Sequence, residues 1–179
     1  ATIGKAIGNG WPISAVLGRK DIMDLFQDVF FSFTFAGDTS AMAAALAVLD
    51  LLETTDAYQK IDTFGTTLAD ACMVFAEMSG LENMWRLHGR PAWLAFNFVG
   101  KDGDIDDLIR TLWIQEVTRR GVLILTTFNP TAVYTESELF TILNAFAGAF
   151  KMVGSALSAG NDLASLLDGP IPTPAFKAR

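Results

Sequence analysis

The first residue in the chain that suggests chemistry is a lysine in a glycine-rich segment. Lys5 follows Gly4 and precedes Gly8 and Gly10, and no acidic residue lies close to it in the sequence. Three interpretations are open for this lysine. It belongs to a phosphate-binding loop, it is a solvated lysine in a surface turn, or it forms a Schiff base with a carbonyl compound or with pyridoxal phosphate.

The phosphate-binding loop does not fit the spacing. That loop needs a glycine, four further residues and then Gly-Lys followed by Ser or Thr. Here Ala6 follows the lysine, and only three residues precede Gly4. The other two interpretations both remain open, because most lysines are solvated, and a Schiff-base lysine needs a strand end and small neighbours that leave room around it.

The elements that must position this lysine follow from the apolar pattern of the first fifty residues. Residues 13–17 and 29–35 are predicted as short buried strands, with one or two helical turns over 21–26 between them. An alanine-rich helix is predicted over 41–52, with Asp38, Thr39 or Ser40 as its N-cap. Small residues recur along one face of this helix, so we expect close packing in the core or at a subunit interface.

The rest of the chain predicts a second group of elements. It begins with a helix over about 58–78 ended by Gly80, a strand over 93–99 and a turn at 101–103. A helix over about 105–120 ended by Gly121 and a strand over 122–125 follow. A Thr135–Glu138 capping box then begins a long helix, and an extended tail covers 169–174. Strands and helices in this order predict an α/β architecture with a break near residues 53–57. The first part has too few strands to close a layer, so we expect further sequence before it.

Composition narrows the classes of function. The chain has 51% apolar residues and a net charge of −7, with a mean hydropathy of +0.34 and a pI near 4.6. The high hydropathy predicts an apolar surface that this chain alone does not bury, such as an oligomer or inter-domain interface, and the acidity argues against nucleic acid. No membrane span or signal peptide is recognisable, and the single Cys72 predicts a packed thiol and a reducing cytoplasm. With one histidine and one cysteine, we expect no zinc site.

A family resemblance adds to these patterns. Residues 2–18, TIGKAIGNGWPISAVLG, resemble the cofactor-lysine segment of the class III pyridoxal-phosphate aminotransferases. Residues 31–45 are similar to the family segment that carries a phosphate-contacting threonine before an alanine-rich helix. Residues 112–123 and 134–139 resemble its small-domain helix and its final capped helix. The motifs occur in the family's order over nearly the whole chain, and the glutamate-1-semialdehyde aminomutase-like branch is the most similar.

The resemblance implies a fold, a cofactor and two site residues. The chain would be the C-terminal portion of a fold-type I α/β transferase, with residues 1–54 ending the large cofactor-binding domain and 55–179 forming the small domain. Lys5 would be the catalytic lysine that binds pyridoxal 5'-phosphate as a Schiff base and moves a proton during the reaction. Thr34 would bind the cofactor phosphate at the neighbouring subunit's site, which implies a homodimer. The reaction would be that of an aminotransferase or aminomutase on a small amino donor and carbonyl acceptor.

Some features depart from the family pattern. Asp38-Thr39 stands where many members have Asn-Pro, and residues 126–133 lack the arginine of an Arg-x-x-Pro-Pro run that pairs with a substrate carboxylate. The family's glycine-serine phosphate loop, ring-stacking aromatic residue and pyridine-binding aspartate lie before the lysine, so we expect activity to need an N-terminal portion. The alternative is a non-catalytic interaction or dimerisation fragment of the same fold.

A few residues have two interpretations each. Arg86, His88 and Arg90 flank a Gly-Arg-Pro turn, which is either solvated or lines a substrate entrance. Trp11, beside the lysine loop, either packs under the cofactor or fills the core.

Overall fold

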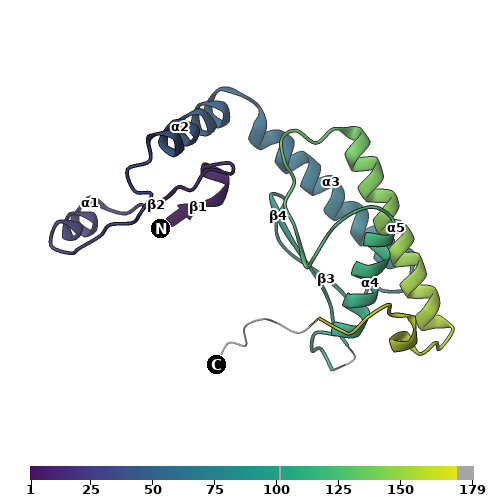
Figure 1. Ribbon diagram of the computed structural model, residues 1–179. Helices are drawn as coiled ribbons and strands as arrows, with labels where there is room; N and C mark the ends of the chain where they lie inside the picture. Colours follow the sequence, from purple (N-terminus) through teal and green to yellow (C-terminus); the bar gives the residue numbers. More distant parts are fainter. Residues whose placement is uncertain (101, 173–179) are drawn as a thin grey trace. The chain divides into compact units, whose positions relative to one another are not determined.

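The computed structural model describes residues 1–100 and 102–172 (Figure 1). The chain divides into two compact units, residues 1–58 and 59–179.

The first unit is built from a strand pair and three helical segments. Strand β1 (Thr2–Gly4) pairs antiparallel with β2 (Ser14–Val16), and the 3-10 helix η1 (Lys5–Ile7) follows β1 directly. Helix α1 (Lys20–Met23), the 3-10 helix η2 (Asp24–Gln27) and helix α2 (Thr39–Thr54) complete the unit. The strand predicted over 13–17 is therefore confirmed as β2, and the helical turns predicted over 21–26 are confirmed as α1 and η2.

Helix α2 begins where the capping pattern predicts. The Asp38 side chain accepts hydrogen bonds from the backbone N–H groups of Ser40, at 2.9 Å, and Ala41, at 3.3 Å. An aspartate in this position satisfies N–H groups that have no partner within the helix. Ala41 and Ala45 are buried on the small-residue face of α2, whereas Leu49 on the same face is 48% exposed.

The strand predicted over residues 29–35 is wrong. This segment has no ladder partner in the described part of the chain, and residues 34–37 form turns. Its alternating sequence FSFTF has the period of a strand, but a strand exists only where a second strand accepts and donates its backbone hydrogen bonds. The apolar side chains of the segment are exposed, and Phe30 is 96% exposed.

The second unit is a small antiparallel sheet covered by helices. Strands β3 (Trp85–Arg90), β4 (Trp93–Phe98) and β5 (Thr127–Phe128) pair in the order β3-β4-β5. The helices are α3 (Ala57–Met78), α4 (Asp107–Arg119) and α5 (Glu136–Ser158), and the 3-10 helix η3 (Leu163–Leu166) follows. Leu94, Phe96 and Phe98 alternate along β4 and are buried on one face of the sheet.

An aromatic cluster forms the centre of this second core. The Trp113 ring of α4 lies 4.9 Å from that of Phe146 and 5.6 Å from that of Phe150, both on α5, measured between centroids. Trp85 of β3 packs against Phe150 at 4.9 Å. Cys72 is buried beside this cluster on α3, so the prediction of a packed thiol is confirmed, and burial raises the pKa of that thiol.

The helix predictions for this unit hold, and one start shifts. The helices predicted from 58, from 105 and after Thr135 are confirmed as α3, α4 and α5, and the capping box is present, with Thr135 N–H donating to Glu138 at 2.8 Å. Helix α4 starts at Asp107 because the Asp106 side chain accepts from the Ile109 N–H at 2.9 Å and caps it. Gly80 and Gly121 have positive φ, as the helix ends require.

The strand predictions for this unit hold only in part. The strand over 93–99 is confirmed as β4, but the strand over 122–125 is wrong, because the pairing with β4 is made by Thr127–Phe128 instead. Strands β1 and β3 were not predicted: β1 is three residues long, and β3 carries polar residues where a turn was expected. Lys101 of the predicted turn, and the end of the predicted tail beyond 172, lie outside the described residues.

Among the described helices, α5 alone is long and apolar enough to cross a membrane by length and composition. Eight of its residues are buried in the second unit. Its apolar sequence is therefore accounted for by its place in that core.

Candidate functional site

Lys5 stands at the end of β1, on the first residue of η1. Its φ is 58°, which places a side-chain-bearing residue in the left-handed region. That conformation costs about 1–2 kcal/mol for a residue other than glycine. The Lys5 carbonyl accepts hydrogen bonds from the backbone N–H groups of Gly8, at 3.0 Å, and Asn9, at 3.2 Å, so the following turn holds it in place.

The lysine amine is available for chemistry. The Lys5 side chain is exposed within the first unit, and among the described residues its Nζ makes neither a hydrogen bond nor an ion pair. Strained backbone that the surrounding structure maintains is concentrated at functional sites. Lys5 has a strained backbone at a strand end and an amine that is accessible and unpaired. These features suit a lysine that binds a carbonyl compound.

The position of Gly8, at the end of this turn, has no room for a side chain. A Cβ on Gly8 would lie 2.4 Å from the Trp11 carbonyl oxygen and 2.6 Å from Ile13 Cγ2. Only glycine fits so close an approach of two segments, and this approach closes the Lys5–Ile13 loop. Trp11 itself is 52% exposed, so within the first unit it does not fill a core.

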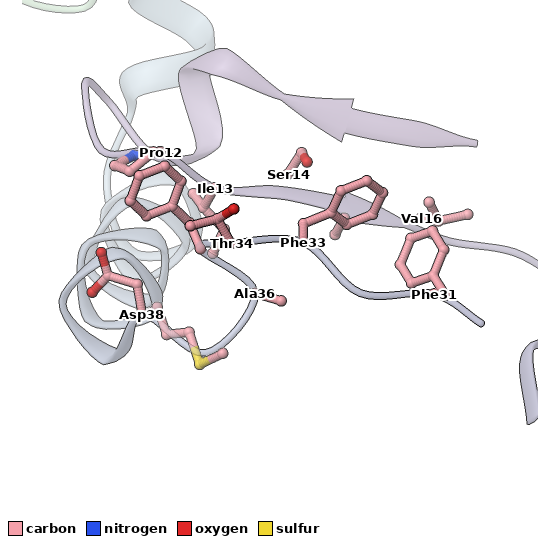
Figure 2. Close-up of a pocket in the computed structure, with 12 residues that line it drawn as sticks. Pro12, Ile13, Ser14, Val16, Phe31, Phe33, Thr34, Ala36 and Asp38 are labelled. Carbon is pink, nitrogen blue, oxygen red and sulfur yellow. The ribbon is translucent and has the colours of Figure 1, made fainter.

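Thr34 lines a cavity of about 820 Å³ between β2, the 31–36 segment and the start of α2 (Figure 2). Its side chain is exposed and makes no hydrogen bond among the described residues. The lining is mainly apolar, and its largest members are Ile13, Val16, Phe31, Phe33, Phe35 and Met42. Lys5 is absent from this lining, so the structure does not bring the two predicted site residues together in the cavity.

The phenylalanines beside Thr34 are ordered against one another. The rings of Phe26 and Phe31 meet edge to face at 4.8 Å, and those of Phe31 and Phe33 at 4.9 Å. The ring of Phe33 nevertheless remains 66% exposed. The threonine hydroxyl therefore sits in an apolar surface, where few competing polar groups are present.

Asn129 has a structural role in residues 126–133, the segment that lacks the arginine of the family pattern. Asn129 Nδ2 donates to the Ala92 carbonyl at 3.4 Å, which ties the loop before α5 to the β3–β4 turn. Arg86, His88 and Arg90 lie on strand β3, which ends directly before the turn at residues 91–92. Within residues 1–100 and 102–172, no group of three or more His, Cys, Asp and Glu side chains is placed to hold a metal ion.

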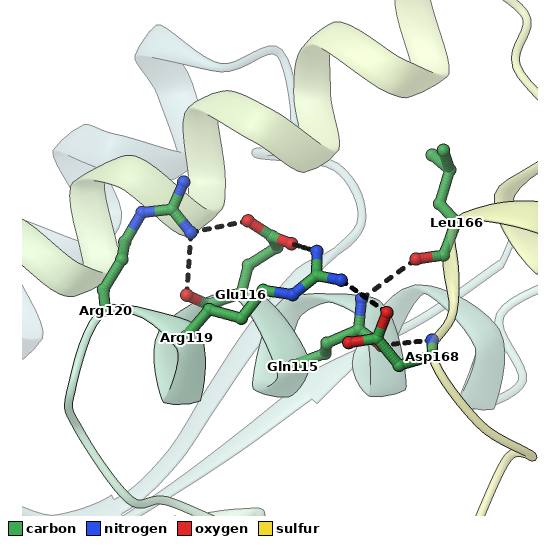
Figure 3. A network of polar contacts seen from close by, with 6 residues as sticks. All are labelled: Gln115, Glu116, Arg119, Arg120, Leu166 and Asp168. Atoms are coloured by element: carbon green, nitrogen blue, oxygen red, sulfur yellow. Dashed lines mark hydrogen bonds and ion pairs between the residues drawn. The ribbon is translucent and has the colours of Figure 1, made fainter.

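Sequence reasoning missed a buried carboxylate on α4 (Figure 3). Glu116 is 4% exposed and accepts from Arg119 and Arg120, each at 2.6 Å. Arg119 also donates to Asp168 at 2.6 Å. Gln115 donates to the Leu166 carbonyl and accepts from the Asp168 N–H. The i, i+3 and i+4 spacing of these charges on one helix was the available signal.

This network fixes the segment after α5 to α4 and contains no reactive group. Burial raises the pKa of Glu116, but the hydrogen bonds from Arg120 and Arg119 oppose it and prevail, so the pKa lies below its ordinary value. The carboxylate is therefore ionised and permanently paired, which suits a structural ion pair.

Comparison with known proteins places the chain in a family. The sequence model of the class III aminotransferases matches residues 1–157, so the chain belongs to the class III aminotransferase family. The family is dependent on pyridoxal phosphate, and the fold is the α/β C-terminal part of such an enzyme. The resemblance seen in the sequence is thereby confirmed.

Two curated relatives illustrate the range of the family. An isoleucine 2-epimerase of Lentilactobacillus buchneri is 30% identical over 164 residues, which cover 85% of this chain and 35% of the epimerase. A glutamate-1-semialdehyde 2,1-aminomutase of Opitutus terrae is 39% identical over 82 residues, which cover 44% of this chain and 19% of the aminomutase.

Among solved structures, the FumI protein of Sphingopyxis sp. MTA144, in its pyridoxal phosphate internal-aldimine form, matches with a TM-score of 0.78 and 24% identity. This match covers 93% of the present chain and 39% of FumI. A phospholyase from Arthrobacter in complex with phosphoethanolamine matches with a TM-score of 0.70 and 26% identity, over 83% of this chain and 37% of the phospholyase. The chain thus spans less than two fifths of the length of these relatives.

Proposed function

We propose that this chain is the C-terminal part of a pyridoxal-phosphate-dependent aminotransferase or aminomutase that acts on a small amino or carbonyl compound. The observation that carries the proposal is Lys5, which stands at a strand end in a strained conformation with an accessible, unpaired amine. Membership of the class III family supports it, because that family uses pyridoxal phosphate.

Lys5 has two tasks in this proposal. Its Nζ would hold the cofactor covalently. When not bound to the cofactor, the same Nζ would act as the base that takes a proton from the substrate carbon that bears nitrogen. The cofactor, when bound, supplies an electron sink that stabilises negative charge on that substrate carbon.

The hydroxyl of Thr34 is proposed to donate a hydrogen bond to the cofactor phosphate. Its unpaired hydroxyl in an apolar surface supports this role, because a charged acceptor there meets little competition. Since Lys5 does not line the same cavity, we assign Thr34 to the cofactor of a second subunit. The protein then works as a homodimer, and the exposed phenylalanines near Thr34 support such an interface.

The names of the relatives support the proposed substrate class. An aminomutase, an amino acid epimerase and an ornithine aminotransferase all act at a carbon that bears an amino group. The remaining cofactor contacts are proposed to come from a portion N-terminal to Lys5, since the chain spans about a third of these relatives' length in the longer matches. A cytoplasmic location is proposed on the ground of the single buried thiol.

Absorbance spectroscopy tests the proposal. The protein is purified with every chain that accompanies it, incubated with pyridoxal phosphate and freed of excess cofactor. The wild type should retain a band in the near-ultraviolet to violet that Lys5→Ala lacks. Lys20→Ala is the matched control, because Lys20 is an exposed lysine of the same unit paired with Asp24 at 2.8 Å, and its band should be unchanged.

Two results would contradict the proposal. One is a wild-type protein without a band after incubation, which would favour the alternative of a non-catalytic interaction or dimerisation fragment. The other is a Lys5→Ala band as strong as that of the wild type. Once the band is found, its change on addition of individual amines identifies the amino donor.

A further inference from the structure

Two arginines in the described part of the second unit, Arg86 and Arg90, have no carboxylate partner there. In residues 59–100 and 102–172, Arg110 pairs with Asp107, Arg119 with Glu116 and Asp168, and Arg120 with Glu116. Arg86 and Arg90 make no ion pair in this part of the chain, and Arg86 donates only to the adjacent Trp85 carbonyl. The chain has 20 acidic residues against 13 lysines and arginines, so a shortage of carboxylates does not explain why these two arginines are unpaired.

These two arginines lie on the same face of one strand. Positions 86, 88 and 90 of β3 alternate with Trp85 and Leu87, which contribute to the core, so Arg86, His88 and Arg90 share the outer face and are exposed. Successive residues on this face are roughly 6.6 Å apart along the strand. His88 therefore lies between Arg86 and Arg90 along the strand.

The neighbouring strands complete this face with small and polar residues. Across the sheet, Arg86 faces Asn97, His88 faces Ala95, and Arg90 faces Trp93. Ala95 is paired in turn with Thr127 of β5. We call these residues the cationic sheet face, and its members are Arg86, His88, Arg90, Trp93, Ala95, Asn97 and Thr127.

The arrangement suits an anion with two charged ends. Arg86 and Arg90 lie on either side of His88 along the strand, and the cross-strand partner of His88 is the small Ala95. Each guanidinium presents a planar fork of donors that matches the two oxygens of a carboxylate or phosphate. Asn97 and Thr127 add neutral donors from the other strands.

We infer that the cationic sheet face binds a small polyvalent oxyanion, a dicarboxylate or a phosphate, through Arg86 and Arg90. Nucleic acid does not fit, because its binding needs many clustered cations and this chain carries a net charge of −7. The inference involves only residues of the second unit and does not depend on Lys5, so it stands or falls separately from the proposed function.

Isothermal titration calorimetry of the full chain tests the site, with succinate as the dicarboxylate probe and inorganic phosphate as the second. Wild type should bind at least one of them saturably, and where both bind, each should displace the other. The variant Arg86→Gln/Arg90→Gln should bind about tenfold or more weakly, since each charge-assisted pair contributes a factor of that order.

The control variant is Lys20→Gln/Lys151→Gln. It also removes two positive charges, from exposed residues that do not belong to β3, and should bind within about twofold of wild type. Circular dichroism checks that both variants are folded. Absence of saturable binding of both probes to wild type would overturn the inference. So would an equal loss of affinity in both variants, which would mean that the anion responds only to net charge.

Discussion

At Lys5 the surrounding turn determines a conformation that the residue itself disfavours. The hydrogen bonds from Gly8 and Asn9 to the Lys5 carbonyl hold φ at 58°, and the close contact of Gly8 with Trp11 keeps the turn shut. The amine emerges from a rigid support. A rigid support matters in catalysis because a small misplacement of a reacting atom is costly.

Replacement of Gly8 by alanine tests this support. The new Cβ would lie 2.4 Å from the Trp11 carbonyl oxygen, so the loop must open, at a cost of roughly 1–3 kcal/mol. We expect Gly8→Ala to lower the thermal midpoint and to weaken the cofactor band. Gly37→Ala is the control, because a Cβ there meets no atom within 4 Å. A Gly8→Ala protein with wild-type midpoint and band would contradict the assigned role.

Thr34 offers a test of the phosphate contact. Thr34→Val keeps the shape and removes the hydroxyl, so the affinity for pyridoxal phosphate should fall about tenfold, the effect of one hydrogen bond to a charged group. Thr34→Ser keeps the hydroxyl and should bind close to wild type. Titration of the absorbance band gives both constants. Equal affinities for the Val and Ser variants would remove Thr34 from the cofactor site.

At the scale of elements, helices are predictable and several strands are not. Helix α5 can be predicted from its helical apolar period and from the Thr135–Glu138 capping box, which are both local signals. Residues 29–35 contain an alternating stretch and residues 122–125 are a continuous apolar run, yet neither segment has a ladder partner among the described residues. Pairing is a property of two segments, so a strand-like pattern in one of them is insufficient.

The candidate site, too, could be predicted from the sequence only in part. The positions of Lys5 and Thr34 were found from a resemblance in sequence, whereas the left-handed backbone of Lys5 and the separation of the two residues required coordinates. Glu116 was missed because a glutamate on an amphipathic helix is usually solvated. In the folded chain its partner Arg119 also pairs with Asp168, a residue distant in the sequence, and no local pattern predicts that contact.

The Glu116 network predicts a pH dependence. Because the folded-state pKa of Glu116 is lowered, its contribution is complete above the unfolded value of about 4.3 and is lost as the pH falls through the lower folded value. Glu116→Gln should therefore reduce the free energy of unfolding by roughly 2 kcal/mol at pH 7, and by less as the pH falls below about 4.

Urea unfolding of wild type and Glu116→Gln at pH 7 and at a pH below the unfolded value measures this difference. Glu77→Gln is the control, since Glu77 is exposed on α3 and its side chain makes neither an ion pair nor a hydrogen bond among the described residues. It should shift stability by a few tenths of a kcal/mol. A Glu116→Gln effect that is the same at both pH values would show that the charge of Glu116 contributes nothing.

At the scale of the whole molecule, the two units differ in how well they bury apolar residues. The second unit has a closed aromatic core, whereas the first exposes a run of large side chains between Val29 and Phe35. The high mean hydropathy predicted such a surface, and the structure confirms it. An exposed contiguous apolar patch is typical of an interaction site.

We expect this patch to drive association of the chain. Sedimentation velocity should show species larger than 19.4 kDa whose fraction rises with concentration. Phe33→Ser should reduce that fraction, whereas Phe140→Ser should not, although Phe33 and Phe140 are similarly exposed at 66% and 68%. Phe140 lies on α5, outside the patch. Equal effects of both substitutions would mean that general hydrophobicity, and not this patch, drives association.

Reductive trapping tests the central claim most directly. The protein, purified with all its accompanying chains and loaded with pyridoxal phosphate, is treated with borohydride, digested and mapped by mass spectrometry. The account predicts a phosphopyridoxyl group on the peptide that contains Lys5, with Lys20, Lys60 and Lys151 unmodified. A phosphopyridoxyl group on another lysine, or a Lys5 peptide that carries none, would contradict it.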